Sequence, residues 1–110
     1  MQEINVFVVD DHQIFLDGII SLLEDEPNIK IVGTAPNGKL ALERIRTTKA
    51  DVVLMDINMP EMDGIEATKQ LKKTNPDLKI LMLTMHSEPR FIKECLEIGA
   101  KGYVLKNISK

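Results

Sequence analysis

Five polar residues, each placed directly after a short apolar run, are the residues of this sequence most able to do chemistry. Three bear carboxylates, one a hydroxyl and one an amine; they are Asp10, Asp11, Asp56, Thr84 and Lys106. If the runs are parallel strands of one sheet, all five side chains gather at its carboxyl edge, where open α/β sheets place their chemistry. Three carboxylates beside one lysine repel one another, and a hard divalent cation with oxygen ligands would offset that repulsion.

Each carboxylate has a distinct use in such a site. Asp56 ends a buried run, which fixes its position, and a carboxylate can attack phosphorus to give an acyl phosphate. Asp10 and Asp11 together with Asp56 can supply oxygen ligands to one Mg²⁺. The structural alternative for Asp10 and Asp11 is to bind free N–H groups at the start of a helix, and both roles can hold at once.

Lys106 and Thr84 would complete the site. The lysine could pair with Asp56 at rest and with a phosphoryl oxygen after reaction, and the threonine hydroxyl could donate to a phosphoryl oxygen. Alone, each has an ordinary explanation, because a lysine after a strand is usually solvated and a threonine often ends a strand. Their position beside the three carboxylates is what favours a functional role.

Strands and helices alternate along the chain. Apolar runs predict five strands, at Ile4–Val9, Ile29–Ala35, Val52–Met55, Ile80–Leu83 and Lys101–Leu105. Helical periodicity predicts four helices: His12 to Glu24, a second from about Leu40 to about Thr48, a third from Ile65 to before Pro76, and a fourth that Ser87 caps and Gly99 ends. Pro89 falls in the first turn of the fourth, where proline is favoured.

The pattern predicts a parallel sheet with helices on both faces. Val52–Met55 and Ile80–Leu83 are apolar throughout, as in strands buried on both sides. Right-handed crossovers with strand order 2-1-3-4-5 place the first helix on one face and the other three opposite. One helix cannot cover five strands, so we expect a fragment that stops before a fifth helix, or a cover borrowed from another copy.

Composition narrows the function. The 110 residues suit one domain, and a net charge of −3 with a pI near 5.4 argues against a general nucleic-acid or membrane surface. The single cysteine, Cys95, excludes an intrachain disulfide and is expected in the core. No apolar run could span a bilayer and the N-terminus lacks signal-peptide features, so a cytoplasmic location is the default expectation.

Four stretches resemble the receiver domain of bacterial two-component response regulators. They are VVDDH (8–12), LMDINMPEMDG (54–64), LMLTMH (81–86) and GAKGYVLK (99–106). The resemblance covers essentially the whole chain and is most similar to the NarL/FixJ (LuxR-type) subfamily of transcriptional regulators. It implies a flavodoxin-like, doubly wound parallel sheet of order 2-1-3-4-5 whose C-terminal fifth helix is missing. Residues 1–110 would then be one receiver domain without an effector domain.

The resemblance also implies roles for residues. Asp56 would accept a phosphoryl group from the phosphohistidine of a histidine kinase. Mg²⁺ would be bound by Asp11, Asp56 and the backbone carbonyl of Asn58, with Asp10 helping through water. Thr84 and Lys106 would bind the phosphoryl oxygens. The protein would therefore be a signalling switch rather than an enzyme, apart from self-catalysed phosphotransfer and slow autodephosphorylation.

Switching would reach a partner surface and an attached output domain. In this family Thr84 moves toward the phosphate, the aromatic at position 103 swings inward, and the face of the fourth helix, fifth strand and fifth helix changes its contacts. Tyr103 could instead be a half-buried aromatic on an edge strand. Asn58 and His86 match the positions that tune dephosphorylation. A homodimer or a domain-borrowing oligomer remains open.

Two motifs beside the acidic residues have structural readings. His12 follows two carboxylates, but Mg²⁺ prefers oxygen, so we interpret it as a first-turn helix residue. The pairs Met59-Pro60 and Asp63-Gly64 are expected to shape the loop beside Asp56, with Gly64 giving backbone freedom.

Some features depart from the family or leave alternatives. Asn107 replaces a frequent proline, so a cis Lys106–Asn107 bond is an open question. No helix-turn-helix is present, so DNA binding is expected of a missing C-terminal domain and not of this chain. A haloacid dehalogenase-type phosphohydrolase is disfavoured because Asn58 stands where its acid/base aspartate would be. A receiver that no longer takes phosphate and acts as a binding module is the third reading.

Overall fold

Strands and helices alternate along the whole described chain. The structure is a computed structural model and describes residues 3–57, 59, 62–84 and 89–105, with side chains omitted for 89–91 and 105. The strands are β1 (Ile4–Val9), β2 (Ile29–Ala35), β3 (Val52–Asp56), β4 (Lys79–Thr84) and β5 (Gly102–Leu105). The helices are α1 (Gln13–Glu24), α2 (Gly38–Ile45), α3 (Gly64–Thr74) and α4 (Pro89–Glu97).

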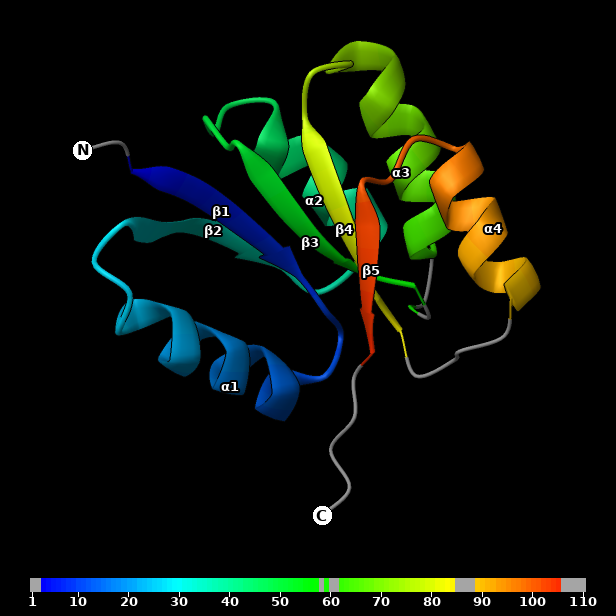
Figure 1. Cartoon of the computed structure of the whole chain (residues 1–110). Coiled ribbons are helices and arrows are strands. Elements are labelled where there is room, and N and C mark those ends of the chain that lie inside the picture. The colour runs from blue at the N-terminus through cyan, green and yellow to red at the C-terminus, as the bar shows by residue number, and fades with distance from the viewer. Residues whose placement is uncertain (1–2, 58, 60–61, 85–88, 106–110) are drawn as a thin grey trace.

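The five strands form one sheet with the predicted order. They pair in parallel as β2-β1-β3-β4-β5, so β3 lies at the centre between β1 and β4. The helix α1 lies on one face of the sheet, and α2, α3 and α4 lie on the other (Figure 1). Within the described residues, the expectation of one helix opposite three is confirmed. The carboxyl ends of all five strands therefore meet at a single edge.

The face under α2, α3 and α4 carries the larger core. Phe7, Met55 and Met82 are almost fully buried there, each from a different strand. On the α1 face the side chains of Val52, Leu54 and Leu81 are only partly buried. The prediction that β3 and β4 are buried on both faces is therefore wrong for these three positions of the second face, although Leu83 is buried there. A single helix packs there among the described elements, and it lies against β1 and β2.

The helix α1 turns a different stripe inward than its first apolar residues suggest. Leu16, Ile19, Ile20 and Leu23 pack toward the sheet with helical spacing. Ile14 and Leu22 point away from it and are highly exposed. Ile14 precedes Leu16 by two residues and so lies about 160° from it around the helix, whereas Leu22 precedes Leu23 by one residue and lies about 100° from it.

Element boundaries agree with the sequence to within a few residues. The largest difference is α2, which ends at Ile45 because the N–H groups of Thr47 and Thr48 bond back to Arg44 and Ile45 in a tight turn. Gly99 follows α4 with a φ of 108°, as expected for a helix stop. Ser87 and the Lys106–Asn107 bond lie outside the described residues.

Cys95 is a core residue, as predicted. It lies on the inner face of α4 at 1% exposure, and burial raises the pKa of its thiol, with the charge of Glu94 raising it further. A thiol held protonated in this way is a poor nucleophile. None of the described helices is long and apolar enough to cross a membrane.

Candidate functional site

Strand register brings three of the five chemically able residues to one place. Val9 pairs with Met55, so Asp10 and Asp56 follow side by side at the ends of β1 and β3. Asp56 in turn pairs with Leu83, which places Thr84 one step beyond it on β4. All three are buried, at 1%, 3% and 2% exposure respectively. The predicted gathering at the carboxyl edge is confirmed for these residues.

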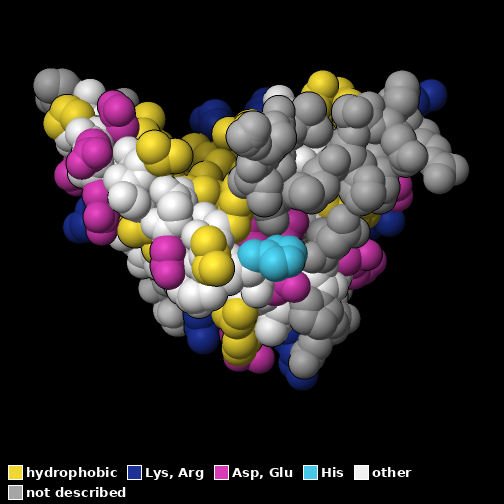
Figure 2. Space-filling view, turned by 90° about the horizontal axis from the view of Figure 1, so that it is seen from below, with side chains coloured by type: hydrophobic (Ala, Val, Ile, Leu, Met, Phe, Trp, Pro, Cys, Tyr) yellow, Lys and Arg dark blue, Asp and Glu magenta, His cyan; other side chains and the backbone are white. Residues whose placement is uncertain are grey.

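The carboxylates form one compact group. Oxygen atoms of Asp10, Asp11 and Asp56 and an imidazole nitrogen of His12 all lie within 4.8 Å of one another. Asp10 and Asp56 are buried, whereas Asp11 and His12 face solvent. Figure 2 shows this edge, with the cyan imidazole of His12 beside magenta carboxylates. Closely spaced carboxylate oxygens with one open side are the donor set that a hard divalent cation requires, so the residues fit Mg²⁺.

The connection between β1 and α1 orients Asp10. The backbone N–H of His12 donates to Asp10 Oδ1 at 2.8 Å, and the N–H of Asp10 donates to the carbonyl of Ala35 at 3.1 Å. His12 is the N-cap of α1 in an extended conformation, and its side chain makes no capping bond. The reading of His12 as a first-turn helix residue is therefore wrong by one position. An Asp at position 10 accepts the N–H just before the helix, which is the local use of a carboxylate expected there.

The imidazole of His12 is directed at the carboxylates. Its Nδ1 lies 3.2 Å from Asp11 Oδ1 and 3.5 Å from Asp10 Oδ1. The side chain is 68% exposed, so the contact is made from the solvent side of the group. Sequence reasoning set this residue aside because Mg²⁺ prefers oxygen. The consecutive residues Asp10, Asp11 and His12 indicate in the sequence that the imidazole could lie near the carboxylates. The extended backbone at His12 is what directs the ring toward them.

The chain beyond β3 packs tightly against Asp56. The N–H of Gly64 donates to the carbonyl of Ile57 at 2.8 Å, and the N–H of Gly38 donates to the carbonyl of Met62 at 3.3 Å. A Cβ on Gly64 would lie 2.1 Å from the backbone oxygen of Asp56. Gly64 is therefore required for space. The predicted reason, backbone freedom, is wrong, because Gly64 is helical and Gly99 is the glycine with positive φ among those described.

Asp63 sets the start of α3 beside the site. Its side chain accepts a hydrogen bond from the N–H of Glu66 at 2.9 Å, which satisfies a donor that the helix itself leaves unpaired. The predicted loop-shaping role of Asp63 thus takes the form of an N-cap. Since α3 begins at Gly64, this cap also fixes the residue that packs on Asp56.

Asp63→Ala is expected to lower the free energy of unfolding by about 1 kcal/mol, because the N-cap bond is lost. Urea unfolding followed by circular dichroism measures the change. Asp63→Asn is the matched control, since asparagine caps a helix about as well as aspartate and removes the same charge. Equal losses in both variants would show that charge, and not the cap, stabilises this end of α3.

Other predicted residues lie elsewhere. Asn58, His86 and Lys106 fall outside the described residues. Tyr103 pairs with Met82, so it projects on the face of the sheet that α4 covers, and it is 41% exposed. This position agrees with a half-buried aromatic on an edge strand and is also where a ring could change its exposure.

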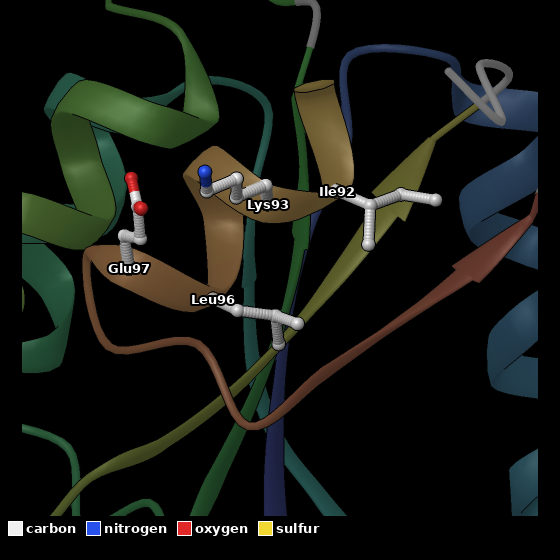
Figure 3. A pocket seen from close by; sticks show the side chains of 4 residues that line it. All are labelled: Ile92, Lys93, Leu96 and Glu97. Atoms are coloured by element: carbon white, nitrogen blue, oxygen red, sulfur yellow. The ribbon is translucent and has the colours of Figure 1, made fainter. Parts of the chain in front are cut away.

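A shallow hollow along α4 is a separate surface feature. Among the residues whose side chains the structure describes, its lining comes from one helix: Ile92, Lys93, Leu96 and Glu97. Figure 3 shows the four side chains standing apart along α4. They do not converge on a common point, so this hollow lacks the arrangement of polar groups that fixes a small ligand.

Comparison with known proteins agrees with the geometry. The response regulator receiver domain family matches residues 6–110. Response regulator UvrY of Escherichia coli (strain K12) is 45% identical over 103 residues, which are 94% of this chain and 47% of UvrY. Transcriptional regulatory protein DegU of Brevibacillus brevis is 39% identical over 106 residues, 96% of this chain and 45% of DegU.

A solved structure gives the same result. The two-component response regulator of the LuxR family from Aurantimonas sp. SI85-9A1 superposes with a TM-score of 0.92 at 35% identity, covering 96% of this chain and 76% of that one. The chain spans about half the length of the two curated relatives.

Proposed function

Because the chain belongs to the response regulator receiver domain family and is similar to its LuxR-type transcriptional regulators, we propose that it is a signalling switch phosphorylated on Asp56. The observation that carries this proposal is the buried carboxylate of Asp56, which ends a central strand inside a compact acidic group. Burial and strand register hold the nucleophile in place, while exposed Asp11 leaves the group open to a donor. Nothing in the family match supports the phosphohydrolase alternative.

The transfer step balances without a further reactant. An oxygen of the Asp56 carboxylate attacks phosphorus of a phosphohistidine, the new O–P bond forms, and the P–N bond breaks with its electron pair returning to the imidazole of the donor. Asp10, Asp11 and Asp56, with the carbonyl of Asn58, would hold Mg²⁺. When bound, the cation would offset the carboxylate charges and screen the incoming phosphoryl group.

Residues of the chain would then bind the new phosphoryl group. A phosphoryl group adds about −1.5 to −2 charges and three strong acceptors. Thr84, buried at the end of β4 next to Asp56, would donate its hydroxyl to one acceptor, and Lys106 would pair with another. Thr84 ends β4, which precedes α4, and Lys106 follows β5, which contacts α4, so the charge change would reach the surface of Tyr103 and α4.

Partners follow from the proposed chemistry. A histidine kinase would supply the phosphoryl group, and a DNA-binding domain outside residues 1–110 would be the controlled output. The chain covers about half the length of its curated relatives, so the output domain would belong to the other half. Asn58 and His86 would set how long the acyl phosphate survives. A homodimer or an oligomer that borrows a cover for the α1 face of the sheet would be the assembled state.

Removing divalent metal tests the proposed function. Incubation with acetyl phosphate and Mg²⁺ is expected to add one phosphoryl group, measured by intact mass, and excess EDTA is expected to prevent the gain. The physical reason is that the buried carboxylates repel an anionic donor unless a cation offsets them. EDTA together with excess Mg²⁺ is the control for the chelator itself. A folded chain that gains no mass with Mg²⁺ would favour a binding module.

A further inference from the structure

The imidazole of His12 lies where a further metal ligand would lie. Its Nδ1 is 3.2 Å from Asp11 Oδ1 and 3.5 Å from Asp10 Oδ1. Neighbouring ligands at about 2.1 Å from an octahedral cation are about 3.0 Å apart, and opposite ligands are about 4.2 Å apart. The two contacts therefore match neighbouring ligand positions to within a few tenths of an ångström. The ligand atoms of all four residues lie within 4.8 Å of one another, which is close to the separation of opposite ligands in an octahedral site.

The local backbone explains why the ring takes this position. His12 is extended, with φ −98° and ψ 104°, and its side chain does not cap α1. Its own N–H is bonded to Asp10 Oδ1, which holds that carboxylate under the ring. The imidazole is thus available on the solvent side, while Asp10 and Asp56 approach from the buried side.

We propose that His12 is a fourth side-chain ligand, which makes this site bind transition-metal ions that favour imidazole, such as Ni²⁺, more tightly than Mg²⁺. The inference rests on the proposed metal site of the switch and adds a donor that a Mg²⁺ site does not use. Imidazole suits nickel and other late transition metals, whereas carboxylate and water suit magnesium. The three carboxylates would bind both kinds of ion, whereas the imidazole of His12 would bind only the transition-metal ion.

The same contacts have another explanation that the test must separate. A protonated imidazole attracted to Asp11 would also sit near 3.2 Å, without any role toward metal. The two explanations differ in what happens to Mg²⁺ and Ni²⁺ affinity when the ring is removed. A charge partner would alter both ions alike, whereas a ligand would alter Ni²⁺ selectively.

The experiment compares Ni²⁺ and Mg²⁺ binding by calorimetry at one fixed pH. The variant is His12→Ala, which keeps the backbone donor to Asp10 and loses no side-chain cap. The matched control is Gln13→Ala, since Gln13 is the exposed neighbour of His12 and its side chain bonds Asp17 and not the acidic group. Loss of a partner that merely orients a ligand weakens metal binding by about 10–100-fold, so Ni²⁺ binding to His12→Ala should fall by about tenfold or more. Mg²⁺ binding should stay within about threefold of the parent, because hard cations use the oxygens.

Pulsed electron paramagnetic resonance of the chain loaded with Cu²⁺, an ion that favours imidazole, gives a second readout that does not depend on affinity. A histidine nitrogen coupled to the metal should be present in the parent and in Gln13→Ala and absent in His12→Ala. Unchanged Ni²⁺ affinity and no nitrogen coupling, with Mg²⁺ bound normally, would overturn the role of His12 and leave the phosphorylation proposal standing. A folded parent that binds no divalent ion would instead overturn the metal site of the proposed function.

Discussion

Asp56→Asn is expected to abolish the gain of a phosphoryl group from acetyl phosphate and Mg²⁺. The amide that replaces the carboxylate is not nucleophilic toward phosphorus, and no other described carboxylate ends a strand at the same depth beside Thr84. The fold should survive, because the substitution keeps the shape of the side chain and removes one of three mutually repelling charges. Intact mass before and after incubation measures the gain.

Asp77→Asn is the matched control for this loss. Asp77 is exposed in the loop that precedes β4, at the edge of the sheet opposite the site, so its substitution removes the same charge without touching the acidic group. Its labelling should equal that of the parent chain. Continued labelling of Asp56→Asn, with the mass mapped to another residue, would show that the phosphoacceptor is assigned wrongly.

Gly64→Ala is expected to destabilise the chain by about 1–3 kcal/mol, as overpacking does in well-packed cores. The added Cβ would lie 2.1 Å from the backbone oxygen of Asp56 and 2.9 Å from its carbonyl carbon. These are backbone atoms of a central strand, so relief requires movement of β3 or α3. Urea unfolding measures the change, and slower labelling of Asp56 should accompany it because the nucleophile shifts.

Gly18→Ala gives the same chemical change without the clash. A Cβ on Gly18 would meet nothing within 4 Å, and the residue is exposed inside α1. Alanine there should stabilise by roughly 0.5–1 kcal/mol through helix propensity and a less flexible unfolded chain. If both glycine variants gained stability, the close approach of α3 to Asp56 would not be a constraint on the fold.

Much of the sheet could be predicted because its signals are local. The first two strands begin and end where their apolar runs do; β3 extends one residue further at its C-terminal end and β4 one residue further at each end. Every second side chain of these runs enters the core beneath α2, α3 and α4, so the apolar pattern of the sequence matches the observed burial. The end of α2 was less predictable, because no glycine or proline marks Arg46 and the turn is made by N–H groups of Thr47 and Thr48.

The candidate site divides in the same way. Strand order alone places Asp10, Asp56 and Thr84 together, because residues at the ends of neighbouring parallel strands lie side by side. The direction of the His12 ring and the reason for Gly64 could not be predicted in this way. The first depends on the local backbone conformation that brings the ring 3.2 Å from the carboxylate of Asp11, and the second on the close approach of Gly64 to the backbone of Asp56. Residue types and spacing do not encode such distances directly.

The two hydrogen bonds that fasten the loop after β3 have a consequence for how such proteins diverge. Gly64 to Ile57 and Gly38 to Met62 are bonds between main-chain atoms, and no loop side chain takes part in them. A loop residue whose side chain does not pack on the core can therefore be exchanged over generations without displacing Asp56, whereas Met59 and Met62 pack against the core. Position 58, where a residue is proposed to govern the lifetime of the acyl phosphate, lies inside this fastened stretch. The duration of a signal can evolve there while the ability to receive it is inherited intact.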